Sequence, residues 1–306
     1  MSARRAIFAA MVLLGPSTPA LSQTPLSAPA NNIDDRVRLQ LRPLTDRERE
    51  EALLTGDTDI VLTRRTRLFS VNGSFDLSGT SNAFLSPTGR VSDVNVQTQL
   101  GFGLATRIGD KVDLFASIGV LGVRYFEFKA LDYNALTGLV GARARFGRLA
   151  VTATYQPSIV LTRDFGRRQL TSHRFKFAVS LPLRINNLTV EPMIAAERTL
   201  SSPSDYRAWS GSAGVTFSTS LSKKVPLLAY VSAQYERRSF DGYFPDLVGV
   251  RRLDDGWSVG AGVVWRPRNW GEVRASYSLQ RSYSTSDVNG YLAHSGTLGF
   301  SASLRF

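Results

Sequence analysis

Side chains suited to catalysis are scarce in this sequence. It contains two histidines, His173 and His294, and no cysteine, which excludes a thiolate nucleophile, a disulfide and a cysteine metal site. A hydrolase needs an acid–base group that a carboxylate orients. His173 with Asp164, or His294 with Asp287, would be the candidate pairs. Because no stronger catalytic spacing accompanies them, we expect no enzymatic activity, no cofactor and no metal.

Charged side chains instead recur on one face of alternating segments. Rings of Arg and Lys around a passage favour anions, whereas opposite charges on neighbouring positions form ion pairs that stiffen a wall. Both interpretations stay open. The charges expected on this face are Arg107, Arg143, Arg145, Arg174, Lys176, Arg184, Arg266, Arg274 and Arg305, against Asp76, Asp113, Glu191, Glu197, Glu236 and Glu272. The candidates for selectivity are Arg107, Arg143, Arg145, Arg174, Lys176, Arg274, Glu191, Glu197 and Glu236.

The elements that would position these charges are β-strands. From residue 66 onward apolar and polar residues alternate, the pattern of strands with one apolar face. The sixth segment is the clearest, with Phe175, Phe177 and Val179 against Arg174 and Lys176. Twelve such segments can be assigned: 69–77, 94–107, 112–120, 136–146, 149–161, 175–183, 188–196, 209–221, 227–235, 257–265, 273–279 and 296–306. The apolar positions assigned in them carry no charged residue.

Connection lengths support the same architecture. Short turns are expected near residues 109, 147, 186, 223 and 268, and longer loops at 79–92, 127–133, 163–171, 201–206, 240–253 and 283–291. Short turns on one side and long loops on the other, with an even number of strands, are typical of bacterial outer-membrane barrels. The prediction is an all-β, antiparallel, up-and-down transmembrane barrel of twelve strands. Pro157 and Pro192 fall within strands, where we expect bulges or local distortion.

The two ends of the sequence point to the same compartment. Arg4 and Arg5 precede a short apolar run, and small residues follow at 20–22, so residues 1–22 are predicted to be a signal peptide. Residues 23–65 are predicted to be a periplasmic extension, with a short helix at 46–54; a plug inside the barrel is the other possibility. The barrel occupies residues 66–306. The terminal Phe306 resembles the C-terminal signal that the barrel-assembly machinery reads.

Overall charge and hydropathy also fit a barrel. Removing residues 1–22 takes away two arginines and reduces the net charge from +12 to +10. The mean hydropathy is −0.09, because only alternate residues of a barrel face lipid; a soluble all-β protein would be the other source of such a value. We expect outer-membrane lipids, lipopolysaccharide and small solutes as partners, and no nucleic acid.

Two kinds of side chain are expected at the membrane surfaces. Loop arginines are candidates for lipopolysaccharide phosphates: Arg163, Arg167, Arg168, Arg251 and Arg252. Aromatic residues are expected to form belts at the two interfaces. The periplasmic belt would comprise Phe146, Trp265, Trp270 and Phe306, and the outer belt Tyr125, Phe126, Trp209, Tyr235 and Trp257.

The first long loop carries a family resemblance. Residues 78–84, SGTSNAF, followed by Arg90-Val91-Ser92-Asp93, resemble the start of β-barrel porins of Proteobacteria, some of which belong to exopolysaccharide export systems. The resemblance implies a diffusion or export pore without catalytic residues. Passive passage of small hydrophilic, anionic or saccharide solutes is therefore the expected function. A structural or assembly protein with a plugged lumen, an outer-membrane hydrolase and an autotransporter translocator are the alternatives, and residues 23–65 leave no passenger for the last.

Overall fold

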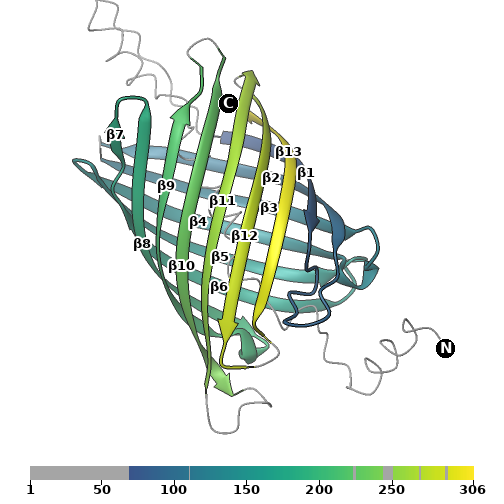
Figure 1. The fold of residues 1–306 in the computed structure, drawn as a ribbon. Coiled ribbons are helices and arrows are strands. Elements are labelled where there is room, and N and C mark those ends of the chain that lie inside the picture. Colours follow the sequence, from purple (N-terminus) through teal and green to yellow (C-terminus); the bar gives the residue numbers. More distant parts are fainter. Residues whose placement is uncertain (1–68, 110, 223–224, 244–250, 269, 287–288) are drawn as a thin grey trace, which may run out of the picture.

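The fold is a closed antiparallel β-barrel (Figure 1). A computed structural model describes residues 69–306, except 110, 223–224, 244–250, 269, 287–288 and the side chain of residue 305. The expected signal peptide, extension and short helix lie outside the described residues. The strands are β1 (Phe69–Thr80), β2 (Asp93–Ile108), β3 (Val112–Tyr125), β4 (Tyr133–Phe146), β5 (Leu149–Thr162), β6 (Arg168–Ser180), β7 (Leu183–Ile185), β8 (Leu188–Ser202), β9 (Ala208–Ser220), β10 (Leu227–Tyr243), β11 (Arg251–Arg268), β12 (Gly271–Ser284) and β13 (Tyr291–Arg305).

The barrel wall has twelve strands, as expected, because β6 and β7 act as one. Both pair with β8, and Ser180↔Met193 and Leu183↔Val190 belong to a single register. Pro182 separates the two pieces and has no N–H to donate to the ladder. Every other strand pairs with the next along the chain, and β1 pairs with β13 to close the wall. Phe69 and Phe306 exchange backbone hydrogen bonds at this seam.

The alternation places large apolar side chains outside. Phe175 and Phe177 on β6 are 46% and 52% exposed, and the intervening Lys176 faces the other way. Val231 on β10 and Val259 on β11 are likewise exposed on the outer surface. A Lys or Arg facing the bilayer midplane costs about 2–4 kcal/mol, which accounts for the absence of charge there. No helix in the described part of the chain has the length and apolar character to span a membrane.

Both prolines bring the local distortion expected at these positions, without a bulge: the β4–β5 ladder is interrupted at Pro157, and the strand opposite Pro192 is broken. Pro157 leaves the β5–β6 register unbroken, and its ring fits against Gly138 of β4, where a Cβ would lie 3.0 Å from Pro157 Cγ. Pro192 lies opposite the break between β6 and β7, and its carbonyl accepts the Leu181 N–H at 3.1 Å. The register shifts occur elsewhere, at Val160/Leu161, Ser239/Tyr243 and Trp265/Arg268. A missing partner residue and a small neighbour therefore accommodate these prolines without an inserted residue.

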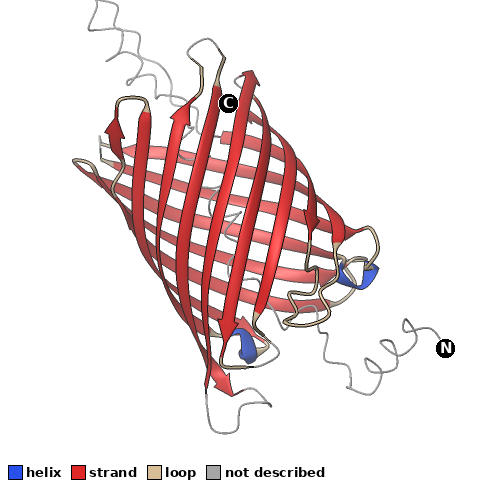
Figure 2. Cartoon of the chain, in the orientation of Figure 1, coloured by secondary structure: helices blue, strands red, loops and turns tan. Residues whose placement is uncertain are grey.

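The connections confirm the predicted asymmetry between the two ends. Short turns at 147–148 and 186–187 lie at the end of the C-terminus, which is the periplasmic end of such barrels. The opposite, extracellular end carries the loop 81–92 and the 3₁₀ helices η1 (Lys129–Leu131) and η2 (Ser204–Tyr206) (Figure 2). The segment expected as a loop at 240–253 is shorter than predicted, because β10 continues to Tyr243 and β11 begins at Arg251.

Candidate functional site: the charged lumen wall

Near the periplasmic end, one aspartate holds two arginines on the lumen side. Asp113 is the second residue of β3, with Arg107 of β2 and Arg143 of β4 as its cross-strand neighbours. Arg107 Nε donates to Asp113 Oδ1 at 2.7 Å, and Arg145 Nη2 donates to Asp113 Oδ2 at 3.1 Å. Three arginines thus surround one carboxylate on adjacent strands, which leaves this part of the wall with a positive surplus.

Two arginines of the lumen wall, Arg143 on β4 and Arg174 on β6, form no ion pair in the described structure. Within the described residues, neither has a carboxylate within 4 Å, although Arg143 lies in electrostatic range of Asp113 and Glu191. Arg143 Nε is buried and has no hydrogen-bond partner among the described residues. Arg174 lies on β6 between Gln156 of β5 and Thr199 of β8, both uncharged. Among the described residues of the wall, we take these two guanidiniums as the candidate anion-binding groups.

A second ion pair crosses an intervening strand. Arg274 of β12 donates through Nη2 to Asp76 Oδ1 of β1 at 2.6 Å, and both residues are 8% exposed. β13 lies between them, and Gly299 is the residue opposite both Asp76 and Arg274. A Cβ on Gly299 would overlap the Asp76 carboxylate and lie 2.7 Å from Arg274 Nε. The bare backbone of Gly299 is therefore what allows the two side chains to meet.

The extracellular half of the lumen wall contains two further ion pairs, and the sequence alone indicated only one of their four members. Glu236 was a candidate, and its partner is Arg238, whose Nη2 donates to Glu236 Oε1 at 2.9 Å. Arg252 and Asp254 form another pair, with Arg252 stacked 4.3 Å from the ring centre of Phe240. Because residues 240–253 were expected to form a loop, Arg252 was expected to contact lipopolysaccharide phosphates. The prediction is wrong: Arg252 lies on β11 and its side chain faces the lumen. The polar alternation continuing past Tyr235 was the available signal.

The remaining candidates are distributed along the same face. Lys176 is the cross-strand neighbour of Glu197, and Glu197 accepts from the Thr199 hydroxyl at 3.3 Å and lies in electrostatic range of Arg238. Glu191, on β8, is buried and lies in electrostatic range of Arg143 on β4. The other two charges expected in pairs are Arg266 and Glu272, 3.1 Å apart. Arg184 donates to the Asn186 carbonyl in a turn, and the side chain of residue 305 lies outside the described part.

The two histidines lie on the outward face of the wall, on β6 and β13. His173 Nδ1 is 2.8 Å from the Tyr155 hydroxyl, and His294 Nδ1 is 2.5 Å from the Tyr277 hydroxyl. Asp164 is engaged within its own hairpin, where the Thr162 hydroxyl and the Gly166 N–H hold its pKa below the ordinary value. Asp287 lies outside the described residues.

Replacing both histidines should leave the conductance of the barrel unchanged. We expect the variant with His173→Ala and His294→Ala to lose about 1 kcal/mol of stability per lost hydrogen bond and to retain the conductance of the parent barrel. Planar-bilayer recordings of the refolded protein, together with urea unfolding, would check both values. Loss of conductance in a folded double variant would contradict this expectation.

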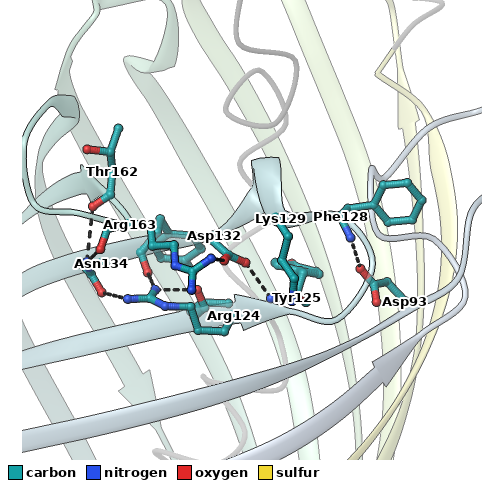
Figure 3. A network of polar contacts seen from close by, with 11 residues as sticks. Asp93, Arg124, Tyr125, Phe128, Lys129, Asp132, Asn134, Thr162 and Arg163 are labelled. Atoms are coloured by element: carbon teal, nitrogen blue, oxygen red, sulfur yellow. Dashed lines mark hydrogen bonds and ion pairs between the residues drawn. The ribbon is translucent and has the colours of Figure 1, made fainter. Parts of the chain in front are cut away.

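At the extracellular rim, a polar network fastens two loops to the wall (Figure 3). Arg124 donates to the carbonyls of Val123 and Tyr133 and to Asn134 Oδ1, at 2.7–2.8 Å. Asn134 in turn donates through Nδ2 to the carbonyls of Thr162 and Arg163. The result is a continuous chain of hydrogen bonds from β3 through β4 to the hairpin 163–167.

Two aspartates complete the network. Asp132 accepts the Tyr125 N–H at 2.7 Å and pairs with Arg163 at 3.3 Å, and Asp93 Oδ2 accepts the Phe128 N–H at 3.0 Å. Tyr125 was expected in the outer aromatic belt, but it lies on the odd-numbered, lumen-facing positions of β3. Arg163, expected to meet lipopolysaccharide, is thus already engaged by a carboxylate.

Removing the central amide should release the hairpin. Asn134→Ala deletes two donated hydrogen bonds from a buried side chain, for which we expect a local cost of about 1–3 kcal/mol. Trypsin should then cut faster after Arg163, Arg167 or Arg168. Asn72→Ala is the matched control, because Asn72 donates only to exposed Ser70. Equal cutting rates in parent and Asn134→Ala would show that the network does not hold the hairpin.

Comparisons with known proteins support the architecture. No protein-family model and no curated protein sequence matches the chain. Among solved structures, an outer-membrane channel from Pseudomonas putida F1 is similar with a TM-score of 0.50, at 10% identity over 81% of this chain and 100% of that one. A bacterial polysaccharide outer-membrane secretin gives a TM-score of 0.46, at 12% identity over 79% and 100%.

A third similar structure is another barrel of nearly the same coverage. LpxR from Salmonella typhimurium gives a TM-score of 0.45, at 14% identity over 76% of this chain and 99% of that one. Identities this low bear on the fold alone. The similarity to the Pseudomonas putida channel and the twelve-stranded closed wall both show the fold of an outer-membrane β-barrel.

Proposed function

We propose that this barrel is a passive pore for small hydrophilic solutes, with a preference for anions. The observation that carries the proposal is the chemistry of the barrel interior. In the described residues, one small apolar cluster occurs, Tyr230 and Val264 with Leu228 packed on it. Apart from scattered apolar side chains such as Val123, Met193 and Phe240, the described inward positions are mostly polar or charged. This suits a water-filled passage and not a packed apolar core.

The distribution of charge supports anions over cations. Most carboxylates of the inward face form an ion pair with an arginine, on the same or a neighbouring strand for Asp113, Glu236, Asp254 and Glu272, and across one strand for Asp76. Arg143 and Arg174 stand in excess of these pairs. A permeating anion, including an acidic saccharide, gains attraction from both guanidiniums, whereas a cation meets repulsion. No catalytic step belongs to this proposal.

Planar-bilayer electrophysiology tests the proposal. The refolded full chain should produce discrete conductance steps, and its reversal potential in a KCl gradient should have the sign of chloride preference. Uptake of neutral and acidic oligosaccharides into proteoliposomes would then define the solute range. A folded barrel without single-channel steps, or with cation preference, would refute the proposed function.

A second candidate is a structural barrel with a filled lumen, which the burial of the extracellular half favours. Glu236, Arg238, Arg252 and Asp254 are 3–8% exposed, less than expected for side chains on the wall of an open passage. Deleting residues 23–65 discriminates between the two candidates. A plug predicts that the deletion raises conductance, and an open pore predicts no change.

A further inference from the structure

The outer surface of β8–β12 carries charged residues above the lipid-facing stripe. These strands run side by side (Figure 1). The positions facing outward near their extracellular ends include five arginines, which we call the outer arginine patch: Arg198, Arg207, Arg237, Arg251 and Arg281. The described acidic residues among them are Asp205, Asp241 and Asp255. Positive charge is therefore in excess on this surface.

Three of these arginines gather around one carboxylate. Arg198 Nη1 donates to Asp241 Oδ1 at 2.8 Å, and Arg207 and Arg251 lie in electrostatic range of Asp241. The Asp241 N–H donates to the Arg207 carbonyl at 2.9 Å, which fixes the segment after η2 against β10. Asp241 neutralises Arg198, and Arg207 Nε donates to the Ser201 carbonyl at 3.0 Å. The Nη groups of exposed Arg207 and the guanidinium of exposed Arg251 can therefore meet an external anion.

A neighbouring row repeats the arrangement. Arg237 is 60% exposed and lies 3.8 Å from Asp255, which also accepts the Tyr235 hydroxyl at 2.5 Å. Arg281 is stacked 4.8 Å from the ring centre of Tyr283 and has no acidic partner in the described part of the chain. Arg237 is therefore largely exposed to the surroundings, and the partly exposed Arg281 is not neutralised by a described carboxylate.

Aromatic rings separate these charges from the apolar stripe. Trp209, Tyr235 and Trp257 are exposed on β9, β10 and β11, and Arg198 stacks 5.1 Å from the Trp209 ring. Below them, Ile194 and Val231 are exposed on the lipid-facing positions. Tryptophan and tyrosine mark the headgroup level of a bilayer, so the outer arginine patch lies where phosphates of outer-leaflet lipids would be.

We propose that the outer arginine patch binds the phosphate groups of lipopolysaccharide, with the acyl chains on the apolar stripe below. Guanidinium groups form bidentate, charge-assisted hydrogen bonds with phosphate. The amphipathic order of arginines, rings and aliphatic side chains matches a phosphorylated glycolipid better than a free phosphate, which has no apolar part. This binding does not depend on the proposed pore function.

Titration of the refolded full chain with bisphosphorylated lipid A in detergent micelles tests the inference, with native mass spectrometry counting bound lipid. The variant with Arg207→Gln and Arg251→Gln removes two guanidiniums and none of the described ion pairs. We expect its affinity to fall about tenfold or more, the effect of one charge-assisted hydrogen bond or more. The matched control, Arg167→Gln with Arg168→Gln, removes the same charge from the extracellular rim at the β5–β6 hairpin, away from β8–β12, and should remain within about twofold of the parent.

Three outcomes would overturn the inference. Equal losses of lipid A affinity in the two variants would indicate general electrostatic attraction. Unchanged affinity in the variant with Arg207→Gln and Arg251→Gln would exclude the patch as the binding site. Equal binding of dephosphorylated lipid A would exclude phosphate recognition. Far-ultraviolet circular dichroism of both variants confirms that they fold. If the first variant does not fold, Arg281→Gln, which removes only a ring contact, replaces it. Conductance is expected to be unchanged throughout, so failure of the pore proposal would be recognised separately.

Discussion

The substitution Gly299→Ala is expected to destabilise the barrel by about 3 kcal/mol, the scale on which a buried ion pair resists disruption. The added methyl group would occupy the place where Arg274 reaches Asp76 across β13. Either the two side chains separate and leave buried charges without their partner, or β13 moves away from its neighbours. Equilibrium unfolding in urea, followed by tryptophan fluorescence, measures the loss.

The control for this prediction lies on the same strand. Gly296 has no heavy atom within 4 Å of the place of a Cβ, so Gly296→Ala should change stability by no more than about 0.5 kcal/mol. A double-mutant cycle sharpens the test. When Asp76→Ala has already removed the carboxylate, adding Gly299→Ala should cost much less than in the parent, because residues in contact couple. Additive losses would show that the glycine serves another purpose.

Charge reversal at Arg143 and Arg174 is expected to convert chloride preference into cation preference. A unit charge at contact distance in water contributes about 1 kcal/mol, so each neutralisation to Gln should lower the chloride-to-potassium permeability ratio by up to about fivefold. Arg143→Glu with Arg174→Glu doubles the change and should invert the sign of the reversal potential. Bilayer recordings in a KCl gradient measure it.

Two further variants test whether the position of the charge matters. Asp113→Asn removes the carboxylate shared by Arg107 and Arg145, so it should raise chloride preference, the opposite direction. Arg168→Gln changes the same net charge at the exposed outer rim and should have little effect. A selectivity that follows net charge regardless of position would locate the discrimination outside the lumen wall.

Much of the architecture was predictable from the sequence. Alternation of apolar and polar residues assigned all twelve wall strands, because a strand between lipid and a polar interior must show a period of two. The short turns at 147–148 and 186–187 also followed from local residue types. Arg107, Arg143, Arg145, Arg174 and Arg274 could be placed on the inward face for the same reason: once the register of a strand is set, every side chain on it has a side.

The pairing of those charges was decided by the tertiary structure. Asp76 and Arg274 are far apart in sequence and meet because β1, β13 and β12 close the wall, with a glycine between them. The strands β10 and β11 extend beyond their apolar stripe, where no membrane imposes hydrophobicity, so Arg252 turned out to face inward. Periodicity reports the side of the wall that a residue occupies; which charges remain without a partner depends on stagger between strands, and that is set only when the barrel closes.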